Sequence, residues 1–281
     1  MKSMASRAYV TAEGWSAKLS LSFERALART NLRVMERAGP LSVQRPFYPE
    51  EDVCHAYVLH PPGGVVGGDQ LELNVQVREQ SSALITTPAA NKIYRSNGPE
   101  SQIKQQFSVE SGGTLEWLPQ ETILFGGSSL SACTRVNLNP SARFSGWDIV
   151  ILGRPFSGDR YERGAFDQQM TIAVADKPIL NERHRWRNEE PMLGAAWGCR
   201  GNCALASVYA YPADPDLLKR VQRLIASSPA DAGVTLLDQL LVVRILGTAP
   251  QIVRALAEKL WTGMRPLQMG RAASRPRIWS T

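Results

Sequence analysis

The sequence predicts a mostly β protein that ends in about two α-helices. Polar and apolar residues alternate along many short segments in the first three quarters of the chain, and residues 71–77 give the clearest case. A period of two is the pattern of a strand that buries one face. Glycine and proline clusters such as Gly39-Pro40 and Gly112-Gly113 separate these segments. Short strands punctuated in this way favour a large, mostly antiparallel sheet assembly.

The predicted strands follow one another closely from residue 19 to residue 211. They cover residues 19–23, 71–77, 103–109, 132–138, 147–152, 169–174 and 203–211. No linker, repeat or low-complexity stretch separates them. We therefore expect a single domain over residues 1–281, with residues 1–14 and 265–281 as candidate flexible tails.

The last quarter of the chain changes to a helical pattern. Asp214-Pro215 supplies an N-cap and a proline at the first helical position. An apolar stripe at helical spacing follows and ends at Ser227-Ser228-Pro229. Residues 236–246 fit either a buried strand or the end of a helix. A second helix is predicted from Ala249 to about Gly263, with Thr248 as its cap, and both helices are expected to pack on the sheet.

The bulk composition indicates a soluble globular protein. Of 281 residues, 43% are hydrophobic and 21% are charged, and no apolar run reaches the roughly 20 residues of a membrane span. The first ten residues lack the apolar core of a secretory signal. Four cysteines in a chain of this length do not form a disulfide scaffold, so a cytoplasmic location is favoured.

The net charge of +6 is spread along the chain rather than concentrated. A nucleic-acid partner would favour clustered basic residues with aromatic residues between them. An acidic protein partner is therefore the better prediction, and neither nucleic acid nor membrane is expected as a partner. The basic segment 265–277 is predicted to be a solvated arm.

The loop from His60 to Asp69 has the most unusual composition of the chain, with four glycines and two prolines. Gly63 and Gly68 have the spacing of a phosphate-binding loop, but Asp69 replaces its lysine and a strand follows instead of a helix. No G-x-S-x-G motif accompanies the loop, so we predict no catalytic residues. The loop, with Gly63, Gly64, Gly67 and Gly68, is interpreted as a rigid connector that places His60 and Asp69.

Metal binding is a further hypothesis for this region. Cys54, His55 and His60 offer thiolate and imidazole ligands that late first-row metals accept. On a strand, however, Cys54 and His55 point to opposite faces. A buried small side chain for Cys54 and a hydrogen-bonded loop residue for His60 are the alternatives, and both are favoured over a metal site.

Two further segments combine charged and apolar residues. Residues 86–96 include Lys92, and residues 115–125 place Glu116 and Glu121 in an apolar run. Buried charges must be paired or lie against water. Lys92 and Asp69 are therefore expected either to pair across neighbouring strands or to line a wet interior channel.

These segments together resemble the urease accessory protein UreD family, called UreH in some species. The resemblance covers about residues 15–182 and rests on five motifs in the same order: residues 39–50, 60–69, 86–96, 115–125 and 152–155. It implies a β-rich, β-helix-like fold with a pair of helices. It also implies a non-catalytic scaffold that joins UreF and the GTPase UreG on urease apoprotein for nickel insertion. A dimer of heterodimers with UreF is the implied assembly.

The resemblance further implies that nickel(II) passes transiently through an internal tunnel, with no tightly bound cofactor. Scattered oxygen ligands suit passage better than a thiolate and imidazole cage, which would trap the ion. Asp69 and Lys92 are the first candidates for the lining, followed by Asp148 and Glu182. Structural salt bridges are the alternative role for all four. The competing hypothesis is a stand-alone nickel-binding or storage protein that uses Cys54, His55 and His60.

Overall fold

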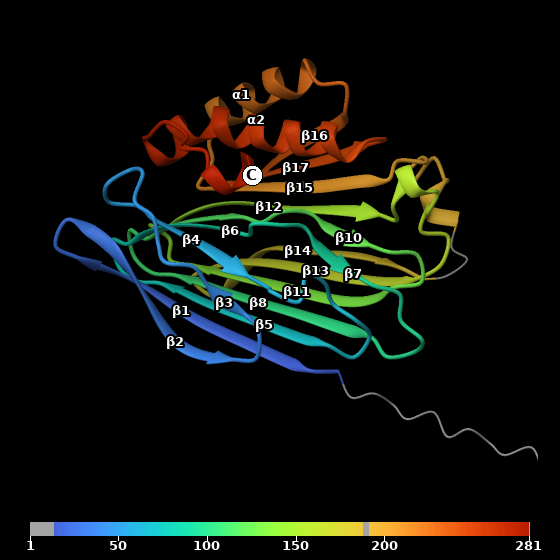
Figure 1. Ribbon diagram of the computed structural model, residues 1–281. Coiled ribbons are helices and arrows are strands. Elements are labelled where there is room, and N and C mark those ends of the chain that lie inside the picture. Colours follow the sequence, from blue (N-terminus) through green and yellow to red (C-terminus); the bar gives the residue numbers. More distant parts are fainter. Residues whose placement is uncertain (1–13, 188–190, 281) are drawn as a thin grey trace, which may run out of the picture.

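The computed structural model describes residues 14–187 and 191–280, which form two stacked β-sheets and a layer of helices (Figure 1). Seven of the described strands form one sheet in the order β14-β13-β11-β8-β5-β1-β2. Their bounds are β1 (Ser16–Ala26), β2 (Arg29–Ala38), β5 (Gln70–Val77), β8 (Ser101–Val109), β11 (Ser129–Leu138), β13 (Ala165–Val174) and β14 (Lys177–Trp186).

The second sheet contains ten of the described strands, eight of them in the order β16-β17-β15-β12-β9-β6-β4-β3, with β10 beside β12 and β7 beside β10. Their bounds are β3 (Ser42–Val43), β4 (Cys54–Leu59), β6 (Ser82–Thr86), β7 (Asn91–Ile93), β9 (Thr114–Leu118), β10 (Thr122–Leu124), β12 (Arg143–Leu152), β15 (Ala204–Tyr211), β16 (Asp231–Leu237) and β17 (Leu240–Gly247). Short 3-10 turns lie at η1 (Pro155–Ser157), η2 (Pro191–Leu193) and η3 (Arg277–Ser280).

The chain crosses between the two sheets after each central strand, which makes the assembly solenoid-like. Strands β1, β5, β8, β11 and β13 pair in parallel in one sheet, and β4, β6, β9 and β12 do so in the other. Antiparallel pairs occur at the flanks, at β1–β2, β13–β14, β12–β15 and β15–β17–β16. The β-rich, β-helix-like prediction is confirmed, and the antiparallel pairing that strand spacing favoured holds only at the flanks.

The period-two pattern determines which side chains enter the space between the sheets. In β5 every second residue from Leu71 to Val77 is buried. These side chains join one apolar cluster with residues from the facing sheet, such as Trp117 and Val150. The tight turn at Gly112, whose φ is 62°, carries the chain from one sheet to the other. The core therefore fills the interior of the solenoid.

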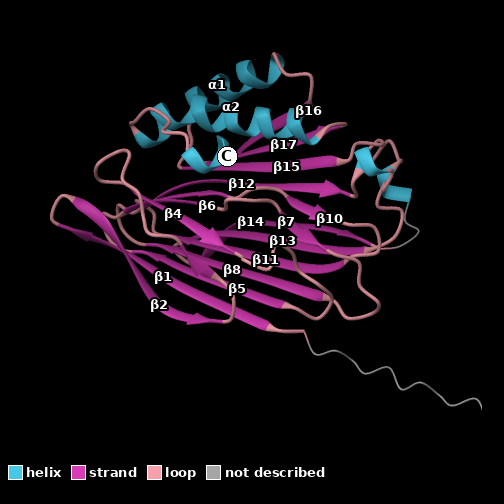
Figure 2. Cartoon of the chain, viewed as in Figure 1, coloured by secondary structure: helices cyan, strands magenta, loops and turns pink. Residues whose placement is uncertain are grey.

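The two helices cover the outer face of the ten-stranded sheet (Figure 2). Helix α1 (Pro215–Ala226) begins as predicted, because the Asp214 side chain accepts a hydrogen bond from Leu217 N at 2.8 Å. Helix α2 (Pro250–Met269) runs past the predicted end at Gly263 and includes Pro266. Its N-cap is Ala249, without a side-chain cap, so the prediction of Thr248 is wrong. Residues 236–246 fall largely in β17, which resolves the alternative in favour of a strand.

The basic segment at the C-terminus is packed on the fold rather than solvated. Arg265 is buried, and Trp279 lies against Trp147 and Trp261 with ring centroids 5.5 and 5.7 Å apart. Trp279 Nε1 also donates to Thr86 Oγ1 at 2.8 Å. The prediction of a flexible, solvated tail is therefore wrong for residues 265–280. The tail predicted at 1–14 lies outside the described residues, apart from Gly14.

Candidate functional site: a polar interior between the sheets

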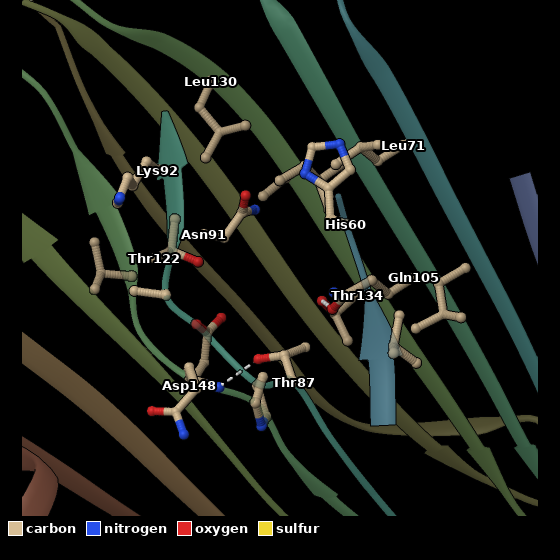
Figure 3. Close-up of a pocket in the computed structure, with 18 of the residues that line it drawn as sticks. His60, Leu71, Thr87, Asn91, Lys92, Gln105, Thr122, Leu130, Thr134 and Asp148 are labelled. Carbon is tan, nitrogen blue, oxygen red and sulfur yellow. Dashed lines mark hydrogen bonds between the residues drawn. The ribbon is translucent and has the colours of Figure 1, made fainter. Parts of the chain in front are cut away.

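Two cavities occupy part of the space between the sheets. The first, of about 230 Å³, is lined by polar side chains from both sheets and the loops (Figure 3), among them His60, Thr87, Asn91, Lys92, Gln105, Thr122, Thr134, Asp148 and Gln168. The second, of about 560 Å³, is lined among others by Asp148, Gln168, Glu182, His184, Cys199, Ser207, Tyr209 and Arg244. Both are lined by Asp148, Val150 and Gln168. The two cavities therefore adjoin at these residues.

The glycine loop places His60 at the first cavity. Its ring lies 5.3 Å from that of Trp15, its buried Nε2 has no hydrogen-bond partner within the described part of the chain, and burial lowers its pKa. Gly68 adopts a φ of 93°, which favours glycine, and a Cβ at Gly64 would meet Tyr94 Cε2 at 2.2 Å. The loop is thus held in one shape by its glycines.

Asp69 orders this loop from within. Its carboxylate accepts hydrogen bonds from Val66 N at 2.9 Å and Trp15 N at 3.3 Å, and the side chain is buried. Asp69 is not among the residues that line either cavity. Its contacts therefore match the structural alternative better than the predicted tunnel lining.

Lys92 lies on the short strand β7 and lines the first cavity. The residue is exposed, and its backbone carbonyl accepts from Val65 N at 2.7 Å. Among the described residues no ion pair joins Lys92 to Asp69, so the predicted pairing does not form. The channel-lining alternative is the one compatible with its position.

Asp148 lies where the two cavities meet. It projects from β12 of the ten-stranded sheet, and Gln168 from β13 of the facing sheet donates a hydrogen bond to its Oδ2. Asp148 is half-buried and is one of the lining residues of both cavities. Burial raises the pKa of Asp148 to about 6, with Glu182 adding to the effect and His184 and Gln168 opposing it.

Glu182 belongs to the same polar cluster but is fully compensated. Its Oε1 accepts from Arg244 Nε at 2.7 Å and lies 3.2 Å from His184 Nε2, and its Oε2 accepts from Tyr209 OH at 3.3 Å. Burial alone would raise the pKa of Glu182, but the bonds from His184 and Arg244 lower it to about 2. Burial raises the pKa of Tyr209 well above its ordinary value. Glu182 is therefore an ionised acceptor that is paired with the Arg244 cation.

The residues of the alternative metal site do not come together. Cys54 lies in the apolar interior, where burial raises the pKa of its thiol to about 11. His55 Nε2 is 2.7 Å from Glu50 Oε1, and His60 lies at the first cavity. Within residues 14–187 and 191–280 no group of three His, Cys, Asp or Glu side chains could hold a metal ion. Cys54 and His60 are thus separate features.

Comparison with known proteins identifies the family. The model of the UreD urease accessory protein family matches residues 16–280. A urease accessory protein UreD from Pseudomonas putida (strain W619) is 44% identical over 269 residues, which are 95% of each chain. Similar proteins with that name occur in Alkalilimnicola ehrlichii (44% identical; 95% of this chain and 92% of that one) and Aliivibrio fischeri (41%; 96% and 98%).

The chain belongs to the UreD family. The family model and these relatives all carry the name urease accessory protein UreD. Across the part of the chain that the structure describes, no helix is both long and apolar enough to cross a membrane.

Sequence reasoning missed a buried ionic cluster in this UreD-family chain. Arg265 from α2 pairs with Glu116 of β9 at 2.8 Å and with Glu50 at 2.6 Å. Trp261 Nε1 donates to Glu116 Oε2 at 2.6 Å. The carboxylate of Glu116 in an apolar run signalled that a partner must exist. The partner lies 149 residues further along the chain, where no local pattern could indicate it.

The polar partners at the second cavity were also missed. Gln168, His184, Tyr209 and Arg244 gather from strands other than that of Asp148. Glu182 and His184 are two residues apart on β14 and therefore share one face of that strand, which was the one available signal.

Proposed function

We propose that this UreD-family chain is a non-catalytic urease maturation factor that conducts nickel(II) through its two cavities. It would act in the cytoplasm with UreF and the GTPase UreG, bound to urease apoprotein as a dimer of heterodimers with UreF. The observation that carries the proposal is the junction of the two cavities at Asp148. A passage between two sheets can deliver an ion without contact with bulk water.

The chemistry of the lining suits passage of a divalent cation. Hydroxyl and amide groups are the most numerous polar groups of the first cavity, which also holds Asp148, Lys92 and Lys104. Such scattered oxygen ligands hold nickel(II) more weakly than thiolate or imidazole cages do. Asp148 has no cationic partner among the ion pairs of the described residues, whereas Glu182 is occupied by Arg244 and His184. Asp148 is therefore the carboxylate best placed to attract the ion.

The substitution Asp148→Asn tests the proposal, because it keeps the shape and removes the charge. We expect the complex with UreF, UreG and urease apoprotein to assemble at its normal mass. The nickel content of urease should fall on the order of tenfold, the effect of about 1.4 kcal/mol. Asp167→Asn is the matched control, because Asp167 pairs with Arg183 instead of lining a cavity. Normal nickel content in the Asp148 variant would remove the conduit from consideration.

A further inference from the structure

A hydrogen bond between the two sheets divides the polar interior into its two cavities. Gln168 Nε2 on β13 donates to Asp148 Oδ2 on β12, and these two side chains line both cavities. With Val150 they form the boundary that the cavities share. An ion that crosses this shared boundary passes close to the bond.

The Gln168 amide is oriented by Asp148 and has His184 at its other end. An ionised carboxylate only accepts hydrogen bonds, so the amide must turn its NH₂ group toward Asp148. Its Oε1 then lies 3.4 Å from His184 Nδ1, and His184 Nε2 lies 3.2 Å from Glu182 Oε1. Arg244 holds Glu182 in turn. The closed arrangement is thus one continuous polar chain, anchored at an ion pair on one end.

Within this row of polar side chains, the charges of Glu182 and Asp148 are unequally compensated. Glu182 has Arg244 and His184 beside it, but Asp148 accepts its one identified hydrogen bond from a neutral amide. The attraction between a carboxylate and a divalent cation is a full charge interaction, which is stronger than a bond from a neutral donor in a poorly solvated interior. Rotation of the released amide would present its Oε1 as a further oxygen ligand.

We propose that the bond between Gln168 and Asp148 is a gate that a divalent cation opens by taking the carboxylate from Gln168. The inference rests on the proposed conduit and assigns its point of control. After the ion has passed, the amide returns to Asp148 and the cavities are separated again. Gln168 is thus a positioning residue for the carboxylate and a transient ligand of the ion.

Two substitutions at Gln168 test the gate in opposite directions. Gln168→Ala removes the bridge and should speed transfer of nickel to urease apoprotein at least twofold in the assembled complex. Gln168→Glu places a second carboxylate beside Asp148, so equilibrium dialysis should show at least tenfold tighter nickel retention by the complex and slower transfer. Gln169→Ala is the matched control, because Gln169 is the next residue on β13 and bonds to Asn181 on an exposed surface.

A plug in the first cavity separates failure of the gate from failure of the conduit. Leu71→Trp fills the cavity from β5, which β8 and β11 separate from β13, and Leu73→Trp replaces it if that variant does not assemble. Blocked transfer in the plugged complex, together with a wild-type or slower rate in Gln168→Ala, would overturn the gate and keep the conduit. Unchanged transfer in an assembled plugged complex would overturn both.

Discussion

Replacement of Arg265 by methionine should destabilise the fold far more than removal of an exposed charge. The guanidinium is fully buried and donates to Glu116 through Nε and Nη2 and to Glu50 through both Nη atoms. Burial alone would lower the pKa of Arg265, but these bonds raise it, so the charge is permanent. Methionine has a similar length and no charge. It would leave two carboxylates in a poorly solvated site without their cation.

Removing one partner of a buried ion pair costs about 3–5 kcal/mol, because the remaining charge is stranded. For a chain of this size each kcal/mol lowers the melting temperature by about 2–4 °C, so the expected drop is roughly 6–20 °C. Arg78→Met is the control, because Arg78 pairs with Glu110 at 2.6 Å while half exposed. An exposed pair contributes about 0.2–1 kcal/mol.

Urea unfolding followed by tryptophan fluorescence measures both variants, since Trp261 bonds to Glu116 within the cluster. A second substitution, Glu116→Gln, in the Arg265→Met background should recover roughly 1–2 kcal/mol by removing one stranded charge. A loss within about 1 kcal/mol of the Arg78 control, or no recovery in the double variant, would refute the reasoning.

Three further outcomes can be checked by the same unfolding measurement. The pKa of Asp148 is raised from 3.8 to about 6, so the folded state binds this proton more tightly than the unfolded state does. The resulting stabilisation is complete below pH 3.8 and is lost as the pH rises through 6. The free energy of unfolding of Asp148→Asn should therefore exceed that of the wild type by about 1–3 kcal/mol at pH 8 and equal it at pH 4. Trp279→Ala, which removes the contact with Trp147 and the bond to Thr86, should lose about 2–3 kcal/mol, whereas a freely solvated tail would show no loss. Gly64→Ala forces a collision with Tyr94 and should lose about 1–3 kcal/mol. An equal or smaller loss than in Gly233→Ala, where space is open and φ is ordinary, would contradict it.

The alternation of polar and apolar residues was sufficient to place most strands. Residues 71–77 fall within β5, which buries every second side chain. Residues 147–152 fall within β12, which is buried on both faces. The cap at Asp214 located helix α1 to the residue. These signals are local, and local interactions decide whether a segment is a strand or a helix.

Pairing direction and the C-terminal packing could not be predicted in the same way. A strand's alternation reports which face is buried, and it is the same beside a parallel or an antiparallel neighbour. Arg265 meets Glu50, which lies 215 residues away in sequence, and a run of basic residues looks solvated until that partner is known. Contacts of this length are set by the whole fold.

The candidate site shows the same difference between local signals and long-range contacts. Asp148 and Glu182 both line the second cavity, whereas Asp69, chosen for its place in a motif, accepts bonds from the backbone of its own loop and from Trp15. A motif indicates that a residue matters without separating a structural role from a transport role. The side chains that surround Asp148 come from strands far apart in sequence.

Three carboxylates, one buried and two half-buried, have distinct physical roles in the fold. Glu116 is compensated by Arg265 and Trp261, and Glu182 by Arg244 and His184, so each joins elements that are distant in sequence. Asp148 alone of the three is bridged by a neutral amide, and its raised pKa records an unfavourable charge at neutral pH. Stability alone would favour asparagine at this position. A carboxylate that destabilises the fold yet lies where two cavities meet is expected of a residue that binds a passing cation. If Asp148→Asn is both more stable and slower in nickel delivery, Asp148 lowers the stability of the fold and serves transport.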